Sequence, residues 1–521
     1  MSDMRKVKIL WVDDEIDLLK AHILYLKEKG FGVSTANNGQ DALAMVDEEH
    51  FDLIFLDENM PGLSGLEVLT RLKNKKPELP VVMITKSEEE DIMDQAIGSK
   101  ISDYLIKPVN PNQILLTIKK HVDQRRLVAE KTTSSYQTEF GKIGLKINDS
   151  YSFKDWAEVY KQLVHWEIEL EDTKGEMDEV LKMQKTEANH AFAKYVKRNY
   201  FDWINNPDEN TPLLSHQLMK EVTLPLLEKG EKVFMLVIDN FRYDQWVMLK
   251  QELLKAFRME QEELYSSILP TATQFARNSL FSGLMPAKIK EIYPQYWLDE
   301  HEEGSKNQFE SELIGTFFDR FRKKVNYSYQ KINNIESGKQ LMDNYNNMLN
   351  NDLSVVVFNF VDMLSHARTE SKMIKELAND ESAYRSLSKS WFLHSVMKEL
   401  LDRLENEDVK IIITTDHGTI RVKNPIKVVG DKTITTNLRY KQGKNLAYKA
   451  KEVFEVTKPD TIDLPKVNVS TRYVFATNDD FFAYPNNYNH YVSYYKDTFQ
   501  HGGVSMEEML IPYVVLTPKN K

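Results

Sequence analysis

Aspartate, histidine and threonine side chains recur in short motifs through the C-terminal part of the chain. The motifs are Asp239-Asn240-Phe241-Arg242-Tyr243-Asp244, Pro270-Thr271-Ala272-Thr273, Asp362-x-x-x-His366, Asp416-His417-Gly418 and His501-Gly502-Gly503. The chain has no Cys, and a site built from Asp and His suits Zn²⁺, or less readily Mn²⁺. Two such ions can hold the attacking and leaving oxygens of a phosphoryl displacement, and a coordinated Thr hydroxyl can act as the nucleophile. The motifs therefore predict a metal-dependent phosphoester hydrolase.

A second group of carboxylates lies in the N-terminal part. Asp13, Asp14 and Asp57 follow short apolar runs, and together they would make an oxygen-rich site for a hard cation such as Mg²⁺. One of these carboxylates could attack a phosphoryl group while the others hold the ion. Lys107 could pair with the transferred group as a point charge, and Thr85 could hydrogen-bond one of its oxygens. The pattern predicts a phosphorylation site.

Alternating elements are expected to position these carboxylates in residues 1–122. Short apolar runs at 8–12, 53–56, 81–84 and 103–106 predict buried strands, and the amphipathic stretches 15–29 and 65–73 predict helices between them. This alternation is typical of a parallel sheet with helices on both faces. Ligands of such sheets bind at the carboxyl ends of the strands, where the polar residues fall.

A helical segment is predicted for residues 123–215. There is almost no Gly or Pro between Tyr151 and Asn206, and apolar and aromatic residues recur at helical spacing. Ser152 followed by Asp155 is typical of a capping box at a helix start. We expect a small helical bundle that acts as a connector or dimerisation element, with its aromatic stripe in the core.

Residues 216–521 are expected to form a larger α/β domain. Three predicted strands, 233–238, 354–361 and 410–415, each end in an aspartate of the motifs above. The stretch 423–458 is basic and strand-like, and we interpret it as an insertion on the main sheet. Its cationic side chains could receive a polyanion or could form a solvated basic face; they are Lys423, Lys427, Lys432, Arg439, Lys441 and Lys444.

Composition excludes some classes of protein. The formal net charge of −11 argues against non-specific binding of duplex DNA, and no recognition-helix module is visible, so sequence-specific DNA binding is not expected. The first apolar run is too short for a signal peptide, and no apolar run reaches the length of a membrane span. We expect a soluble cytoplasmic protein without membrane insertion.

The N-terminal motifs resemble the receiver domain of response regulators, which has a flavodoxin-like fold. The resemblance implies that Asp57 takes a phosphoryl group from a sensor histidine kinase, and that Thr85 and Tyr104 form a switch pair that reorients on phosphorylation. The implied magnesium ligands are Asp14, Asp57 and the Asn59 carbonyl, with Asp13 acting through water. We expect phosphorylation to pair two chains into a homodimer through receivers and connectors.

The C-terminal motifs resemble the alkaline phosphatase superfamily, and within it the PglZ-type domain, over roughly residues 225–518. The start Asp239-x-x-Arg-Tyr-Asp and the ending His501-Gly-Gly-x-Ser-x-Glu-Glu-Met, with Ile511-Pro512, carry this resemblance. One zinc ion would then be held by Asp239, Thr273, Asp416 and His417, and the other by Asp362, His366 and His501. Thr273 would be the nucleophile, through a phospho-threonine, with Thr271 as the alternative.

Residues that contact the substrate cannot be read from this motif. Related phosphodiesterases continue Phe-Pro-Asn after the nucleophile, whereas this chain reads Gln274-Phe275-Ala276. The candidates by proximity alone are Arg242, Arg277 and Asn278.

A receiver, a helical connector and a PglZ domain in this order resemble the response regulators tied to type IX secretion in Bacteroidetes. The resemblance implies a phosphodiester substrate, such as a short or cyclic oligonucleotide. An alternative is a signalling scaffold that binds a sigma factor or a secretion-motor component, with hydrolysis secondary. A weaker alternative is that the chain binds DNA directly as a regulator.

Overall fold

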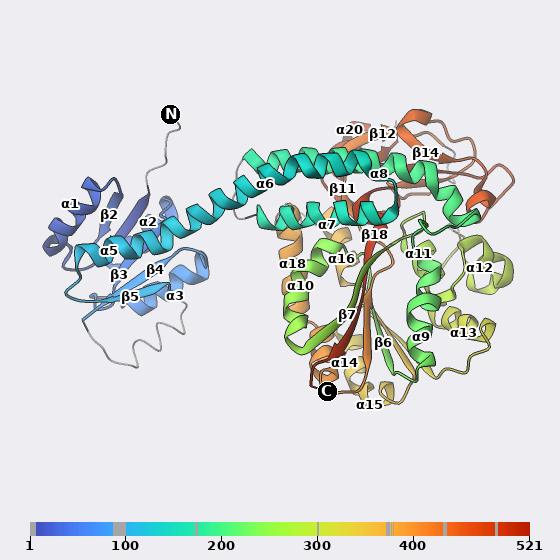
Figure 1. Ribbon diagram of the computed structural model, residues 1–521, viewed down its shortest axis with the longest axis horizontal. Coiled ribbons are helices and arrows are strands. Elements are labelled where there is room, and N and C mark those ends of the chain that lie inside the picture. Colours follow the sequence, from blue (N-terminus) through green and yellow to red (C-terminus); the bar gives the residue numbers. More distant parts are fainter. Residues whose placement is uncertain are drawn as a thin grey trace. The chain divides into compact units, whose positions relative to one another are not determined.

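The computed structural model describes residues 7–86, 101–171, 176–299, 302–370, 376, 378, 380–430, 435–484 and 488–520 (Figure 1). The chain divides into two compact units, Met1–Ser135 and Tyr136–Lys521. Among the described residues, no helix combines the length and apolar composition needed to cross a bilayer.

The first unit contains a five-stranded parallel sheet of order β2-β1-β3-β4-β5. The strands are β1 (Lys8–Val12), β2 (Gly32–Ala36), β3 (Leu53–Asp57), β4 (Val81–Thr85) and β5 (Asp103–Ile106). The helical elements are η1 (Ile16–Leu19), α1 (Lys20–Glu28), α2 (Gly39–Glu48), α3 (Gly65–Lys75), α5 (Pro111–Ile118) and η2 (Lys119–Asp123). The predicted receiver fold is confirmed.

Strand β3 shows why this fold needs continuous apolar runs. Its alternate side chains enter two different cores, with Ile54 and Leu56 on one face and Leu53 and Phe55 on the other. A parallel strand covered on both faces must therefore be apolar throughout. Gly65 begins α3 close behind the strand, where an added Cβ would lie 2.4 Å from the Asp57 carbonyl oxygen.

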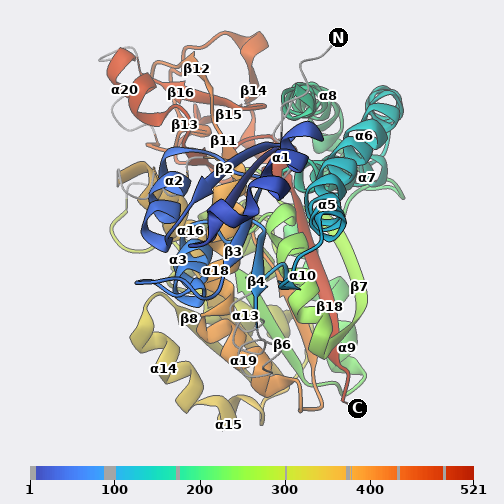
Figure 2. The ribbon, with the colours of Figure 1, turned by 90° about the vertical axis from the view of Figure 1, so that its left-hand side faces the viewer.

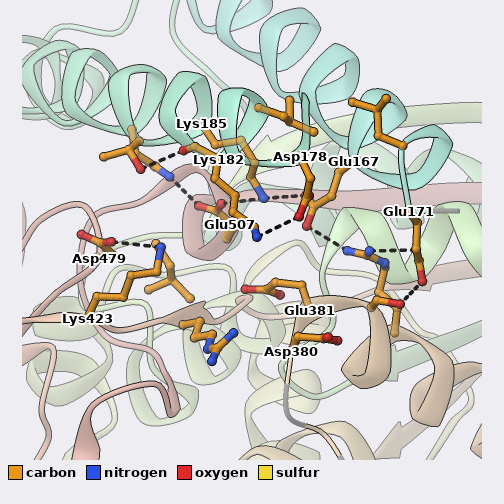
Figure 3. Close-up of a pocket in the computed structure, with 18 of the residues that line it drawn as sticks. Glu167, Glu171, Asp178, Lys182, Lys185, Asp380, Glu381, Lys423, Asp479 and Glu507 are labelled. Carbon is orange, nitrogen blue, oxygen red and sulfur yellow. Dashed lines mark hydrogen bonds and ion pairs between the residues drawn. The ribbon is translucent and has the colours of Figure 1, made fainter. Parts of the chain in front are cut away.

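Three long helices follow: α6 (Gln124–Asp149), α7 (Phe153–Glu169) and α8 (Glu176–Asn205). The capping box expected at Ser152 forms, because its side chain accepts from the Asp155 N–H and Asp155 accepts from the Ser152 N–H. Trp156 and Tyr160 of α7 are buried. The predicted helical middle region is confirmed. From Tyr136 onward these helices share one apolar core with the C-terminal part, and α7 and α8 also line a polar cavity against it (Figure 3).

The second unit is built on a six-stranded sheet of order β7-β18-β10-β6-β9-β8. Strands β10 (Lys410–Thr414), β6 (Val233–Ile238), β9 (Leu353–Phe358) and β8 (Tyr327–Ile332) run parallel; β18 (Leu510–Pro518) is antiparallel to β10 and to β7 (Phe257–Ser266). Its helices are η3 (Ser215–Gln217), η4 (Met219–Thr223), α9 (Leu224–Glu228), α10 (Tyr243–Ala256), α11 (Thr273–Ser282), α12 (Pro286–Ile292), η5 (Pro294–Tyr296), α13 (Glu310–Arg320), α14 (Ile335–Asp343), α15 (Tyr345–Met348), α16 (Phe360–Glu370), α18 (Glu381–Leu393), α19 (Val396–Leu404) and α21 (Met506–Met509).

One strand prediction needs correction. The strand expected over 354–361 ends at Phe358, and Asp362 lies in the first turn of α16. Phe360 and Val361 extend the apolar run into the helix, so the run alone did not mark where the strand ends.

The predicted insertion 423–458 belongs to a longer segment, 420–500, whose described residues form small sheets of their own and add no strand to the six-stranded sheet. Its elements are β11 (Ile420–Arg421), β12 (Asn424–Lys427), β13 (Tyr440–Gly443), η6 (Ala450–Glu452), β14 (Val453–Val456), η7 (Pro459–Ile462), β15 (Arg472–Ala476), β16 (Asp480–Ala483), α20 (Tyr488–Tyr495) and β17 (Phe499–Gln500). In both ribbon views it lies beyond one end of the main sheet (Figures 1 and 2).

The set of cations interpreted as either a polyanion site or a solvated basic face also needs correction. Arg439 and Lys441 are buried, so they cannot form a solvated basic surface. Lys427 and Lys444 are exposed, and Lys423 pairs with Asp479 at 3.5 Å. Lys432 lies outside the described residues.

Candidate metal centre and receiver site

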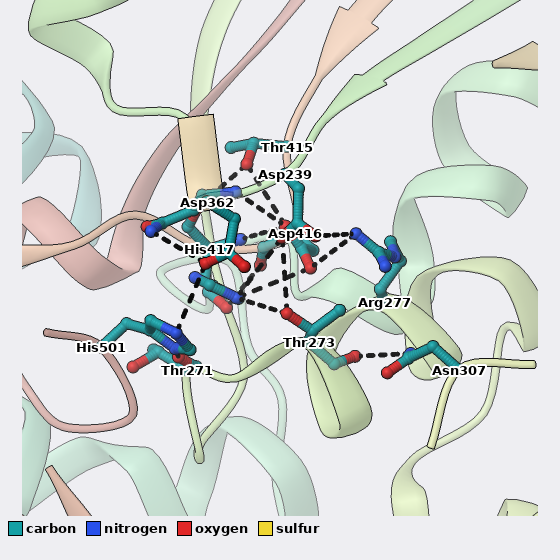
Figure 4. Close-up of polar contacts among 12 residues, drawn as sticks. Asp239, Thr271, Thr273, Arg277, Asn307, Asp362, Thr415, Asp416, His417 and His501 are labelled. Atoms are coloured by element: carbon teal, nitrogen blue, oxygen red, sulfur yellow. Dashed lines mark hydrogen bonds and ion pairs between the residues drawn. The ribbon is translucent and has the colours of Figure 1, made fainter. Parts of the chain in front are cut away.

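Three neighbouring strands bring the motif carboxylates to one edge of the main sheet. Asp239 directly follows β6, Asp416 comes two residues after β10, and Asp362 comes four residues after β9. Because these strands are parallel, their carboxyl ends meet at the same edge. Thr273 at the start of α11 and His501 after β17 face the same point (Figure 4).

The side chains form two adjacent clusters, in each of which the candidate ligand atoms lie within 4.8 Å of one another. One cluster comprises Asp239, Asp416 and His417, and the other comprises Asp362, His366 and His501. The rings of His417 and His501 stack with centroids 4.2 Å apart. The structure therefore brings together the residues that were expected to hold two ions.

Backbone carbonyls orient two of the imidazoles. Nδ1 of His417 lies 3.1 Å from the Gly418 carbonyl oxygen, and Nδ1 of His501 lies 3.1 Å from the Thr271 carbonyl oxygen. A carbonyl oxygen only accepts, so each Nδ1 carries the proton and each Nε2 presents a lone pair. This carbonyl–imidazole arrangement is common behind metal-binding histidines, and the donor set fits a divalent cation.

The two threonines of the Pro-Thr-Ala-Thr motif have different environments. The Thr273 hydroxyl lies 3.1 Å from His417 Nε2 and 3.4 Å from Asp239 Oδ1. The Thr271 hydroxyl is buried, donates to the Gly503 carbonyl at 3.0 Å and accepts from the Gly502 N–H at 3.0 Å. Thr273 therefore faces the cluster of Asp239, Asp416 and His417, while Thr271 bonds the loop that carries His501.

The electrostatics of the centre favour a bound cation. Burial, and then the charge of Asp239, raises the pKa of Asp416 to about 8. Burial alone would raise the pKa of Asp239, but Arg277 and His417 outweigh it and the pKa is lowered. Burial lowers the pKa of His417 and of His501 to about 4. Among the described residues, Asp416 Oδ2 has no hydrogen-bond partner, so this oxygen is available to an ion.

The residues expected to contact substrate are engaged elsewhere. Arg277 is 1% exposed and pairs with Asp239 at 2.6 Å and with Glu310 at 2.5 Å. Asn278 is buried, donates to the Lys306 carbonyl at 3.1 Å and accepts from Asn307 at 3.0 Å. Both candidates for substrate contact are corrected: Arg277 pairs with the candidate ligand Asp239, and Asn278 bonds the segment of Lys306 and Asn307.

The prediction that Arg242 contacts the substrate is also corrected. Arg242 is 2% exposed, donates from Nε to Asp244 at 2.9 Å and pairs with Glu381 at 2.7 Å. Its guanidinium also lies over the rings of Tyr384 and Phe499. This arginine therefore anchors the loop after β6 and has no free face for a substrate.

Sequence reasoning gave no role to Asn240, which joins the clusters. Its backbone adopts the left-handed region, with φ of 63°, which asparagine tolerates better than most residues. Its side-chain amide donates to Asp362 at 3.2 Å, and its N–H lies 3.4 Å from Asp416 Oδ1. Its place directly after a strand-end aspartate was the available signal.

Glu508 and Arg439 form a buried ion pair, at 2.6 Å, that was also missed. Both side chains are inaccessible to solvent. Glu508 accepts from the Gly503 N–H at 2.8 Å, two residues after His501. The pair therefore ties the insertion to the loop that carries a candidate ligand.

The receiver carboxylates form a third cluster. Ligand atoms of Asp13, Asp14 and Asp57 lie within 4.8 Å of one another. Lys107 Nζ lies 2.9 Å from Asp13 and 2.7 Å from Asp57. Burial raises the pKa of Asp57, while the nearby Lys107 opposes that shift.

The expected switch residues lie beside this cluster or on the surface. The Thr85 hydroxyl donates to Glu58 Oε2 at 2.5 Å, a partner that the sequence reasoning missed. Tyr104 is 36% exposed, and Asn59 is exposed two residues after Asp57. In this conformation Thr85 bonds a carboxylate next to Asp57 in the chain.

Three family models match successive parts of the chain. The receiver domain of response regulators matches residues 9–119. The PorX response regulator linker domain matches residues 126–204. The BREX system PglZ alkaline phosphatase-like domain matches residues 218–516, which is more than half of the chain.

Curated relatives share a receiver-sized part. The transcriptional regulatory protein ResD of Bacillus subtilis (strain 168) is 35% identical over 119 residues, which are 23% of this chain and 49% of ResD. AlgB of Pseudomonas aeruginosa, an alginate biosynthesis regulator, is 34% identical over 122 residues, 23% of this chain and 27% of AlgB. The chain thus spans half or less of the length of these relatives.

Solved structures match a similar share of the chain. A CheY-like receiver domain protein from Methanospirillum hungatei is 28% identical, with a TM-score of 0.22, and the match covers 23% of this chain and 95% of that one. TrrA from Thermotoga maritima is 31% identical, with a TM-score of 0.21, and covers 22% of this chain and 97% of its own.

The three domains follow one another in the order found in PorX-like response regulators. Receiver and alkaline phosphatase-like domains generally use divalent metals, in keeping with the three clusters of ligand atoms. The receiver also implies a cognate histidine kinase. The chain belongs to the PglZ family of alkaline phosphatase-like proteins, and its PglZ domain follows a response-regulator receiver and a PorX-type linker.

Proposed function

We propose that phosphorylation of Asp57 controls a two-zinc phosphodiesterase in which Thr273 is the nucleophile. The observation that carries this proposal is the arrangement around the Thr273 hydroxyl. It lies within hydrogen-bonding reach of His417 and Asp239, which belong to one of the two adjacent clusters of candidate ligand atoms. Asp and His ligands without Cys suit zinc at each cluster.

The proposed reaction follows from this placement. Bound zinc would lower the pKa of the Thr273 hydroxyl and stabilise charge on the phosphoryl oxygens. Thr273 Oγ forms a bond to phosphorus, the bond to the leaving oxygen breaks, and the proton lost by the hydroxyl balances the one gained by the departing alcohol. Water then attacks phosphorus, releases a phosphomonoester and restores the Thr273 hydroxyl. Asn307 holds the Thr273 carbonyl at 2.9 Å and so supports the nucleophile.

The receiver would act through its own cluster. Asp57 would take a phosphoryl group from a histidine kinase, with Mg²⁺ held by Asp14, Asp57 and the Asn59 carbonyl and supported by Asp13 through water. Lys107, already 2.7 Å from Asp57, would follow the transferred group. Thr85 would exchange its bond to Glu58 for a phosphoryl oxygen, and Tyr104 would turn inward.

The wider proposals concern partners and biological role. We propose that phosphorylated chains form a homodimer, that the substrate is a nucleotide or oligonucleotide phosphodiester, and that the reaction regulates type IX secretion. The match to the PorX linker supports this last proposal.

The test is hydrolysis of bis(4-nitrophenyl) phosphate by the full chain with zinc, after chelation, and for Thr273→Ala. We expect zinc-dependent turnover that the variant loses. Thr316→Ala is a matched control, because its hydroxyl donates within α13, to the Leu313 carbonyl. Equal turnover by zinc-loaded wild type and Thr273→Ala would refute the proposed nucleophile. Zinc binding without turnover would favour the scaffold role instead.

A further inference from the structure

A polar cavity of about 660 Å³ lies between the connector helices α7 and α8 and the part of the chain that carries the metal centre (Figure 3). Charged side chains of both signs line it, and they come from both sides of the seam. Ion pairs and hydrogen bonds connect the two sides of this cavity. Through further contacts they lead to the loops that carry the candidate metal ligands.

The first series of contacts starts at the end of α7. Arg385 of α18 is 2% exposed, and its guanidinium lies 2.9 Å from Glu167 and 2.9 Å from Glu171. The same guanidinium lies 3.3 Å from Asp244 of α10. One buried cation thus joins two carboxylates of the connector to one carboxylate of the hydrolase.

Asp244 connects Arg385 to the loop after β6. It accepts from Arg242 Nε at 2.9 Å. Arg242 lies three residues after Asp239 and two after Asn240, whose side chain bonds Asp362. The position of Arg242 therefore limits how this loop can place ligands of both clusters.

The second series starts on α8. The side-chain amide of Asn189 donates to Glu507 at 2.9 Å. The next residue, Glu508, bonds the Gly503 N–H at 2.8 Å, and His501 lies two residues before that glycine. The connector thus reaches the loop of the second cluster as well.

The two series are joined to each other and to α6. Lys185 Nζ lies 2.5 Å from Glu167 and 3.5 Å from Glu507. Tyr136 of α6 packs its ring 5.4 Å from that of Trp166, the residue before Glu167. A displacement of α6 would therefore reach the turn of α7 from which the ion pairs extend.

From these contacts, and resting on the hydrolysis proposed above, we infer that Arg385 is a positioning residue through which the connector helices set the geometry of the metal-ligand loops. A buried ionic network adds little net stability compared with apolar packing, but its members tolerate few alternative geometries. Such a network is therefore better suited to transmitting a displacement of the helices than to stabilising their packing.

The test compares zinc affinity, by chelator competition, and steady-state kinetics of the full chain and its variants. Arg385→Gln should weaken zinc binding about tenfold and lower kcat about tenfold, as outer-shell changes commonly do, with little change in KM. Arg385→Lys, which keeps the charge, should recover much of the loss. Arg403→Gln is the control, because Arg403 pairs with Glu399 on the surface of the same unit.

Glu171→Gln covers the possibility that Arg385→Gln does not fold. Glu171 is 29% exposed, and an amide of the same size keeps the hydrogen bond, so the variant should fold and show a smaller loss in the same direction. Folded variants with wild-type zinc affinity and kcat would overturn the inference. If the wild type binds zinc but hydrolyses nothing, the proposed function fails, while the comparison of zinc affinities still decides the role of Arg385.

Discussion

Zinc binding should depend steeply on pH, because one candidate ligand holds a proton in the ion-free protein. Burial, together with the charge of Asp239, raises the pKa of Asp416 to about 8. Burial lowers the pKa of His417 and of His501 to about 4, so both imidazoles are already neutral near pH 7. The proton on Asp416 is therefore the one that an ion at the first cluster must displace.

The size of the effect follows from linkage. At pH 7 about nine in ten ion-free chains carry this proton, and the apparent affinity should fall about 50-fold between pH 8 and pH 6, or roughly 2.3 kcal/mol. The stability of the fold without a bound ion should change in the opposite direction with pH. A carboxyl whose pKa is raised on folding stabilises the fold fully below its ordinary pKa of 3.8, and that stabilisation is lost progressively as the pH rises from there through about 8.

The assay is chelator competition at pH 6, 7 and 8, with Asp57→Asn as the background. That change removes one carboxylate of the receiver cluster, so zinc bound there contributes less to the signal. Calorimetry at pH 7 in two buffers of different ionisation enthalpy should count about 0.9 proton released per ion bound at this cluster.

Two variants separate the clusters. Asp362→Asn removes a ligand of the second cluster and should leave the pH dependence of the first in place. Asp416→Asn should weaken binding and abolish the dependence. An affinity that stays constant from pH 6 to pH 8, without proton release, would refute the protonated Asp416 and the reasoning from burial.

Three further changes test other parts of the structure. Glu508→Ala leaves Arg439 buried without its carboxylate and should cost about 3–5 kcal/mol in the free energy of unfolding, measured by urea denaturation. Thr271→Val removes buried hydrogen bonds and should cost about 1–3 kcal/mol in the same measurement, while zinc-dependent turnover persists at a reduced rate. Lys107→Ala removes the charge that opposes the raised pKa of Asp57. Labelling of Asp57 by acetyl phosphate, measured by mass spectrometry, should therefore slow more in the variant than in wild type as the pH falls from 7 to 5. An identical pH profile in the two proteins would count against this.

Local sequence signals were sufficient for several elements, although not for the end of β9, and for the chemical groups. The runs at 8–12 and 233–238 coincide with β1 and β6, because a continuous apolar run of that length fits a strand buried on both faces. The capping box at Ser152 depends on side chains three residues apart, and it forms as expected. Such signals depend on neighbours in the chain, so they can be read without the fold.

Partners far apart in the chain could not be read in this way. Arg242 and Arg277 were candidates for substrate contact by proximity alone, and Arg439 was one of the cations that could receive a polyanion or lie on a solvated face. Each is instead buried against a distant carboxylate of this chain. The carboxylate paired with Arg277 lies 33 residues away, and the one paired with Arg439 lies 69 residues away.

The sequence by itself determined which functional groups the chain contains, the order of its domains and the strands that end beside the site. Only the tertiary structure decided which cations are neutralised internally and that Asn240 joins the two sets of ligands. It also decided that Thr273, and not Thr271, faces the cluster of Asp239, Asp416 and His417. The physical reason is that burial makes an unpaired charge or polar group costly. The partner that removes this cost is selected by proximity in space, which sequence spacing does not specify.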